Sequence, residues 1–178
     1  MPKCFYLLLL GFFPGILLSQ TASSRFQSAI ELQGSVSFTG LSTSLLYTIQ
    51  RGDHNLYLGP KLALSDLYIW EEGPWGLNLG YRYQLSTKKR WHSLAFLDYH
   101  LLFTRPFEPL GFEAAGWNLT HELYVGYGLQ LRLGEHWYLV SQIGLGGYFE
   151  RLQDVRRGGT IRFSGYSSLL RLGGRYLF

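Results

Sequence analysis

Residues 122–133 read ELYVGYGLQLRL, and apolar residues alternate with polar or small ones along the whole segment. The apolar positions are Leu123, Val125, Tyr127, Leu129, Leu131 and Leu133. A period of two is typical of a β-strand with one apolar and one polar face. The segment is long for a soluble protein, whose strands usually have about five or six residues. It fits the roughly 9–11 residues of a strand that crosses a bilayer at a tilt.

The same alternation recurs in seven further segments. They lie at about 30–38, 41–50, 55–65, 77–85, 91–104, 137–146 and 166–178. Only the third contains a proline, Pro60, which removes one backbone donor from that strand. Outside the N-terminus, no apolar run is long enough for a membrane-spanning helix. The sequence therefore predicts an all-β protein of eight strands.

The connections between these segments differ in length in a regular way. Short ones are expected at 51–54, 86–90 and 134–136, and long ones at 66–75, 105–117 and 149–160. The connection near Gly40 is the exception, because it belongs with the long ones by position and is short. An even strand number with short turns at one end and long loops at the other indicates a closed, antiparallel, up-and-down barrel in an outer membrane. Closure is also required physically, since an open sheet edge would leave unpaired backbone groups in hydrocarbon.

The N-terminus has the pattern of a secretory signal peptide. Lys3 precedes an apolar run at 5–18, and small or polar residues follow at 19–24. We expect residues 1–24 to be removed, with cleavage somewhere in 19–24, and residues 25–178 to form the barrel. A helical anchor is the alternative, although no stop-transfer flank follows Ser24. Cys4 lies before the apolar core, so it cannot be the acylated cysteine of a lipoprotein.

Composition excludes several other classes of protein. The chain has 178 residues, of which 47% are hydrophobic and 17% aromatic, which is too apolar for a disordered protein. Its single cysteine cannot form a disulfide within the chain. The 16 basic and 12 acidic residues are scattered, so no basic stripe indicates a nucleic-acid partner.

The end of the chain carries the most specific local pattern. Apolar or small residues alternate up to a C-terminal phenylalanine: Leu170, Leu172, Gly174, Tyr176 and Phe178. This pattern resembles the signal by which the Bam assembly machinery recognises its substrates. Over residues 25–178 the chain resembles small eight-stranded outer-membrane barrels of the OmpA-transmembrane and OmpX type. The resemblance implies an integral outer-membrane location, both termini in the periplasm, and contact with outer-membrane lipid and lipopolysaccharide.

The polar faces of the eight segments point to the inside of such a barrel. They carry Glu31, Lys61, Arg82, Asp98, His100, Glu122, Gln130, Arg132, Arg171 and Arg175. Eight strands enclose a space just wide enough for side chains to fill, and charges buried there must be paired. We therefore expect a salt-bridged plug across the lumen. A narrow polar channel for small solutes or ions is the alternative.

An enzymatic role is the third hypothesis, since some barrels that resemble this one acylate or deacylate lipid A. The neighbours His92 and Ser93 point to opposite faces of a strand, so they cannot share a site. Asp98 and His100 share a face, but no serine nucleophile accompanies them and that face is turned away from lipid. The five histidines are dispersed. We expect no catalytic residue, no metal site and no cofactor.

Aromatic and basic residues near the long loops are the candidates for specific interactions. They are Trp70, Trp75, Phe107, Phe112, Trp117, Arg156 and Arg157. Packing on one another, contact with lipopolysaccharide headgroups and docking of a partner protein are all compatible with them. Trp91, Trp137 and Phe178 fall near the short turns, as expected for a second aromatic girdle. The function that fits best is a non-enzymatic barrel that presents surface loops, structural or interactive in role, as an accessory subunit of an outer-membrane complex.

Overall fold

The computed structural model describes residues 26–38, 40–65, 70–87, 90–106, 118–154 and 159–178. The expected signal peptide, with its cleavage region, lies outside the described residues. Phe107, Phe112, Trp117, Arg156 and Arg157 lie outside them too. Within the described ranges no helix is long and apolar enough to cross a membrane.

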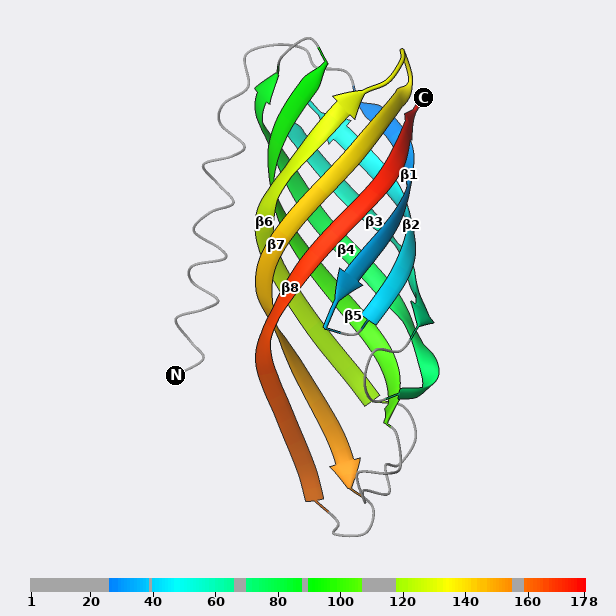
Figure 1. Cartoon of the computed structure of the whole chain (residues 1–178), viewed down its shortest axis with the longest axis vertical. Coiled ribbons are helices and arrows are strands. Elements are labelled where there is room, and N and C mark those ends of the chain that lie inside the picture. Colours follow the sequence, from blue (N-terminus) through cyan, green and yellow to red (C-terminus); the bar gives the residue numbers. More distant parts are fainter. Residues whose placement is uncertain (1–25, 39, 66–69, 88–89, 107–117, 155–158) are drawn as a thin grey trace.

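Eight antiparallel strands form one closed barrel in sequence order, as predicted (Figure 1). They are β1 (Gln27–Ser37), β2 (Gly40–Arg51), β3 (His54–Ser65), β4 (Trp70–Thr87), β5 (Trp91–Pro106), β6 (Asn118–Arg132), β7 (Trp137–Asp154) and β8 (Gly159–Leu177). The first and last strands close the wall through pairs that run from Ala29 with Leu177 to Val36 with Leu170. No strand edge is left open along this seam, which a bilayer requires.

The wall has an apolar outer face and a largely polar inner face. Burial alternates residue by residue, as in β2, where Leu45 and Tyr47 are exposed and Ser44 and Leu46 are buried. Leucine dominates the exposed positions of β3, β4 and β6. This arrangement is inverted relative to a soluble protein, and a barrel surrounded by lipid explains it.

Three expected loops are shorter than the sequence indicated. β4 already begins at Trp70, so Trp70 and Trp75 lie in a strand and not in a loop at 66–75. Residues 105–106 belong to β5. β7 continues to Asp154 and β8 begins at Gly159, so most of the expected 149–160 loop is strand.

The physical reason is that strand pairing satisfies the backbone whether or not the side chains are apolar. The run of Glu, Gly and Pro before Trp75 breaks the alternation and therefore favours a loop in the sequence. In the structure this run is absorbed by register shifts between Trp70 and Glu72 and between Glu72 and Trp75.

Pro60 lies on the exposed face of β3. Pairing between β2 and β3 passes from Ser44 with Lys61 to Tyr47 with Leu58, and Gly59 and Pro60 have no paired residue in β2. The missing donor is therefore accommodated by a local interruption of one ladder, while Pro60 still pairs with Leu77 of β4.

The barrel has two distinct ends (Figure 1). Phe178 lies at the end where β2 turns into β3 and β6 into β7, and its backbone N–H donates to the Ser28 carbonyl over 3.0 Å. We call this the terminal end. At the opposite end, the distal end, the β7–β8 hairpin extends beyond the neighbouring strands.

Candidate functional site

The interior of the described barrel carries many charged side chains. Its buried ionisable residues, besides His100, are Glu31, Lys61, Arg82, Asp98, Glu122, Glu150, Arg171 and Arg175. Four are acids and four are bases, so their formal charges cancel. A lumen with balanced charge is expected to be a plug of ion pairs, because an unpaired charge buried here would cost several kcal/mol.

The first ion pair joins Glu31 of β1 to Arg82 of β4 across the lumen. Both guanidinium Nη atoms contact the carboxylate, with Arg82 Nη2 donating to Glu31 Oε1 over 3.0 Å. The Gln33 amide also donates to Glu31. The Arg82 guanidinium lies 4.2 Å from the centre of the Tyr57 ring, which adds a cation–π contact. Two parallel donors make this the geometry in which an arginine binds a carboxylate most strongly.

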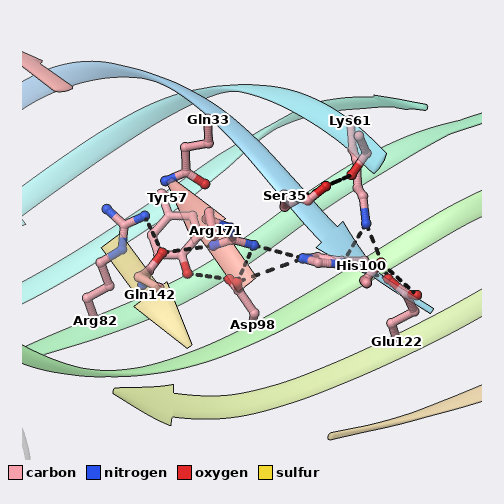
Figure 2. A network of polar contacts seen from close by, with 12 residues as sticks. Gln33, Ser35, Tyr57, Lys61, Arg82, Asp98, His100, Glu122, Gln142 and Arg171 are labelled. Atoms are coloured by element: carbon pink, nitrogen blue, oxygen red, sulfur yellow. Dashed lines mark hydrogen bonds and ion pairs between the residues drawn. The ribbon is translucent and has the colours of Figure 1, made fainter. Parts of the chain in front are cut away.

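The second ion pair joins Asp98 of β5 to Arg171 of β8. The Tyr57 hydroxyl donates to the same carboxylate. Gln142 connects the two ion pairs, because its Oε1 accepts from Arg171 Nη1 at 3.1 Å and from Arg82 Nη2 at 3.3 Å (Figure 2).

His100 connects this group to a third ion pair, Lys61 with Glu122, whose Nζ and Oε2 atoms are 3.3 Å apart. His100 Nδ1 lies 2.8 Å from Glu122 Oε2, and its Nε2 lies 3.0 Å from Arg171 Nη2. Lys61 Nζ also lies near this ring, 3.0 Å from Nδ1. His100 therefore contacts groups of both ion pairs, with Arg171 at one ring nitrogen and Lys61 and Glu122 at the other.

These contacts form one continuous network, seen in Figure 2 as dashed lines that run from Arg82 through Gln142, Arg171 and His100 to Glu122. The buried charges of the lumen come from every strand except β2, which supplies Ser42, Ser44 and Gln50 instead. The network therefore ties opposite walls of the barrel together in addition to the backbone ladders.

Polar contacts also lie toward the two ends of the lumen. At the terminal end, Arg175 Nη2 donates to Gln50 Oε1 over 2.9 Å, beside a small depression that Asp53 and Gln84 also line. Toward the distal end, the hydroxyls of Tyr124 and Ser167 are 2.7 Å apart. Between the two ends, the side chains of the network are buried.

The expected inward residues lie in the lumen with one exception. Glu31, Lys61, Arg82, Asp98, His100, Glu122, Gln130, Arg171 and Arg175 are all buried. Arg132 is exposed, and its Nε donates to the Gly134 carbonyl over 2.9 Å. It is the last residue of β6. Its side chain is on the inner face of the strand, but at this position it lies at the mouth of the barrel, outside the network.

Sequence reasoning missed several polar residues of the lumen. Glu150 falls in the expected 149–160 loop, but the structure continues β7 through it and turns it inward, as Gln142 is. The alternation of β3 puts Tyr57 on the inner face, but nothing in the pattern indicates what its hydroxyl binds. Gln33 and Gln142 also occupy inward positions, and only the closed barrel brings their amides to their partners.

The polar pair considered for catalysis is enclosed in this network. His100 Nε2 and Asp98 Oδ2 are 3.8 Å apart, and both side chains are fully buried. The described partners of His100 are Lys61, Asp98, Glu122, Arg171 and the ring of Tyr124, and none of them is a serine. Elsewhere in β5, His92 Nδ1 is 2.7 Å from the Gln84 amide. Across the described ranges, no three His, Cys, Asp or Glu side chains are grouped so as to hold a metal ion.

The C-terminal residues and Trp75 lie on the outer surface. Leu170, Leu172, Gly174 and Phe178 are exposed, and Tyr176 is partly buried between Trp137 and Phe178. Trp75 stacks on Phe103 with ring centres 4.5 Å apart. These positions are available to lipid.

Comparison with known proteins shows the fold. No protein-family model matches the chain, and no curated protein matches its sequence. Among solved structures, the crystal structure of Neisserial surface protein A superposes with a TM-score of 0.52 at 12% identity, over 86% of this chain and 96% of that one.

Two further structures agree with it. A major outer membrane protein from Thermus thermophilus gives a TM-score of 0.51 at 15% identity, over 86% of this chain and 99% of that one. Outer membrane protein AlkL, solved in lipid bilayers, gives 0.52 at 10% identity, over 90% and 94%. The architecture is thus that of the eight-stranded outer-membrane β-barrels.

Proposed function

We propose that this chain is an integral outer-membrane barrel of non-enzymatic, structural or interactive function, with both termini in the periplasm. The observation that carries the proposal is the combination of an apolar outer wall with a lumen filled by balanced ion pairs. An apolar exterior requires lipid around it, and a filled interior leaves the two ends of the barrel as the surfaces available to partners.

The fold comparison supports the membrane location, since two of the similar structures are named as outer membrane proteins. The expected signal peptide and C-terminal assembly signal point the same way, because they are what export and insertion by a Bam-type machinery would use. With both termini on the periplasmic side, the distal end of the barrel faces the exterior. Trp70, Trp75 and the distal ends of β3, β5 and β7 then lie at or near the cell surface.

Within this proposal, the specific role is that of an accessory subunit of an outer-membrane protein complex. The filled lumen argues against transport, and the buried Asp98–His100 pair is out of reach of a lipid substrate. What remains for recognition is the aromatic and basic distal end and the outer wall.

The test is co-purification of the tagged full chain from its native outer membrane in a mild detergent. A stoichiometric companion protein that persists after a second purification step supports the subunit role. Recovery of the barrel as a lone monomer would overturn that role and leave a free-standing barrel.

The narrow pore has one observation in its favour and is the second candidate. Several buried polar atoms, including both amide atoms of Asn78 and Nε2 of Gln142, have no hydrogen-bond partner among the described residues, and buried groups of this kind are commonly satisfied by ordered water. Conductance of the purified barrel in a planar bilayer decides between the two. We expect no steps above the protein-free baseline, whereas stable ion-selective steps would favour the pore.

A further inference from the structure

Two arginines face each other on the outer wall near the distal end. In the register of β7 with β8, Arg151 pairs directly with Arg162, and both side chains are exposed. Directly opposed residues on adjacent strands have Cβ atoms about 5 Å apart, and like charges in that position are destabilising. Among the side chains that the structure describes, no ion pair joins a carboxylate to either guanidinium. The nearest acid in sequence, Glu150, points into the lumen and is buried.

The level of this pair along the barrel follows from strand geometry. Outward positions of β7 run from Trp137 at the terminal end to Phe149, twelve residues later. At ~3.3 Å per residue and a tilt of ~40°, that distance is about 30 Å along the barrel axis, which matches the hydrocarbon thickness of a bilayer. Arg151 is the next outward position after Phe149, so the arginine pair lies at the level of the lipid headgroups.

The residues just below the pair are those of a membrane interface. Phe149 lies opposite His121 of β6, with ring centres 6.3 Å apart, and His121 Nδ1 is 2.6 Å from the Tyr99 hydroxyl. On β8, Tyr166 is 98% exposed. Aromatic rings with a polar end collect where hydrocarbon meets headgroups. Further down β7, the exposed side chains of Ile143 and Leu145 offer an apolar surface to acyl chains.

We infer that Arg151 and Arg162 form a binding site for the phosphate group of an anionic lipid, a partner class that rests on the membrane location proposed above. Two guanidinium groups side by side can each donate two hydrogen bonds to one phosphate, and the anion removes their mutual repulsion. The apolar wall directly below favours a phosphorylated lipid over a soluble phosphate, because the same molecule can contact both. A single arginine in a neutral surrounding would not distinguish lipids in this way.

An exposed arginine at the terminal end of the barrel differs from this pair in its surroundings. Arg51 is also exposed, at the end of β2, but it pairs in register with His54 and its guanidinium lies 5.1 Å from the centre of the Phe26 ring. It therefore has an aromatic partner and no second arginine opposite, which makes it a suitable control.

The test is lipid binding to the purified full chain, measured by native mass spectrometry after release from detergent micelles. The probes are diphosphoryl lipid A, dephosphorylated lipid A and phosphatidylcholine. We expect the wild-type protein to retain diphosphoryl lipid A at concentrations about tenfold lower than those needed for the other two. The double variant Arg151→Gln/Arg162→Gln should lose this preference, while Arg51→Gln should keep it.

Each other outcome argues against the site. Equal retention of diphosphoryl lipid A by the double variant would overturn it. Displacement of the lipid by an equal concentration of inorganic phosphate would show a phosphate site without a role for the acyl chains. A companion protein that binds wild type and not the double variant in lipid-free conditions would assign the pair to a protein partner instead.

Folding of the variants and the membrane location are measured separately. Folded barrels migrate differently from heat-denatured ones in gels, and insertion into phosphatidylcholine vesicles can be followed in this way. Failure of the wild-type chain to insert would contradict the proposed function, whereas normal insertion without a lipid preference would contradict the site alone. Removing two opposed charges should not impair folding, so the double variant is expected to insert as wild type does.

Discussion

Tyr57 occupies the space that a side chain at Gly80 would need. A Cβ atom placed on Gly80 would lie 2.2 Å from Tyr57 Cζ and equally close to the carboxylate of Asp98. Tyr57 cannot move aside easily, because its hydroxyl binds Asp98 and its ring lies against the guanidinium of Arg82. Because Gly80 has no side chain, Tyr57 can lie in the centre of the lumen. There it donates a hydrogen bond to Asp98 and contacts the guanidinium of Arg82.

Gly80→Ala is accordingly expected to destabilise the barrel. Overpacking of a filled interior costs about 1–3 kcal/mol, and here the displaced groups belong to two ion pairs. The measurement is the free energy of unfolding in urea, followed by tryptophan fluorescence in lipid vesicles.

Gly174→Ala is the matched control, because a Cβ atom there meets nothing within 4 Å on the outer wall. We expect its free energy of unfolding to stay close to that of wild type. An equal loss of stability in both variants would mean that glycine acts through the unfolded chain, and the packing explanation would be wrong.

Breaking the Glu31–Arg82 pair should be more costly than breaking any contact on the outside. Glu31→Gln keeps the shape of the side chain and removes its charge, which leaves Arg82 buried without its carboxylate. Loss of one partner of a buried pair costs about 3–5 kcal/mol. Urea unfolding measures this loss.

The control is Glu135→Gln in the exposed β6–β7 turn, which should change little. The double variant Glu31→Gln/Arg82→Gln should recover part of the loss, since it leaves no unpaired charge. Additive losses in the double variant would contradict the pairing.

The strands could be predicted from sequence because a membrane barrel imposes a simple rule on them. One face of every strand contacts lipid and the other contacts the lumen, so Leu123, Val125 and Tyr127 alternate with inward residues without exception. The strand ends could not be predicted in the same way. Beyond the lipid, only backbone pairing holds a strand, and polar residues such as those before Trp75 pair as well as apolar ones.

The inward residues could be read from the alternation, but their partners could not. Glu31 and Arg82 lie on strands that are three apart in the barrel, and they meet only because the closed wall brings β1 opposite β4 at a fixed stagger. That stagger depends on the register of all eight ladders, including the shift between Leu41 and Ser42 in the β2–β3 ladder. The exposure of Arg132 has the same origin, since the depth of a residue in the lumen is not encoded in its alternation.

The variant Phe178→Ala tests whether the C-terminal ring acts in assembly of the barrel in cells or in stability of the folded barrel. The ring is exposed and contacts Tyr176 at 5.6 Å between centres, and the backbone hydrogen bond to Ser28 does not need it. We expect the variant to refold into vesicles with near wild-type yield. Its amount in the outer membrane of cells should fall severalfold if the C-terminal pattern is the assembly signal.

Trp91→Ala removes another exposed aromatic near the terminal end without touching the last strand, and it is expected to assemble normally. A refolding defect of Phe178→Ala in vesicles as large as its defect in cells would instead indicate a structural role for the ring.

The depth of single tryptophans would test where the membrane lies on the wall. Trp75 on β4 and Trp137 on β7 lie toward opposite ends, whereas Val125 lies in the middle of β6 and is 58% exposed. Variants that keep one tryptophan and replace the others with phenylalanine can be folded into vesicles of lipids brominated at known depths. We expect Trp75 and Trp137 to be quenched most by bromines near the headgroups, and a tryptophan introduced by Val125→Trp to be quenched most by bromines near the chain ends. Deep quenching of Trp75 would mean that the bilayer extends over the part of β4 before it. The headgroups at the distal end would then lie beyond Arg151, and the level assigned to the arginine pair would be wrong.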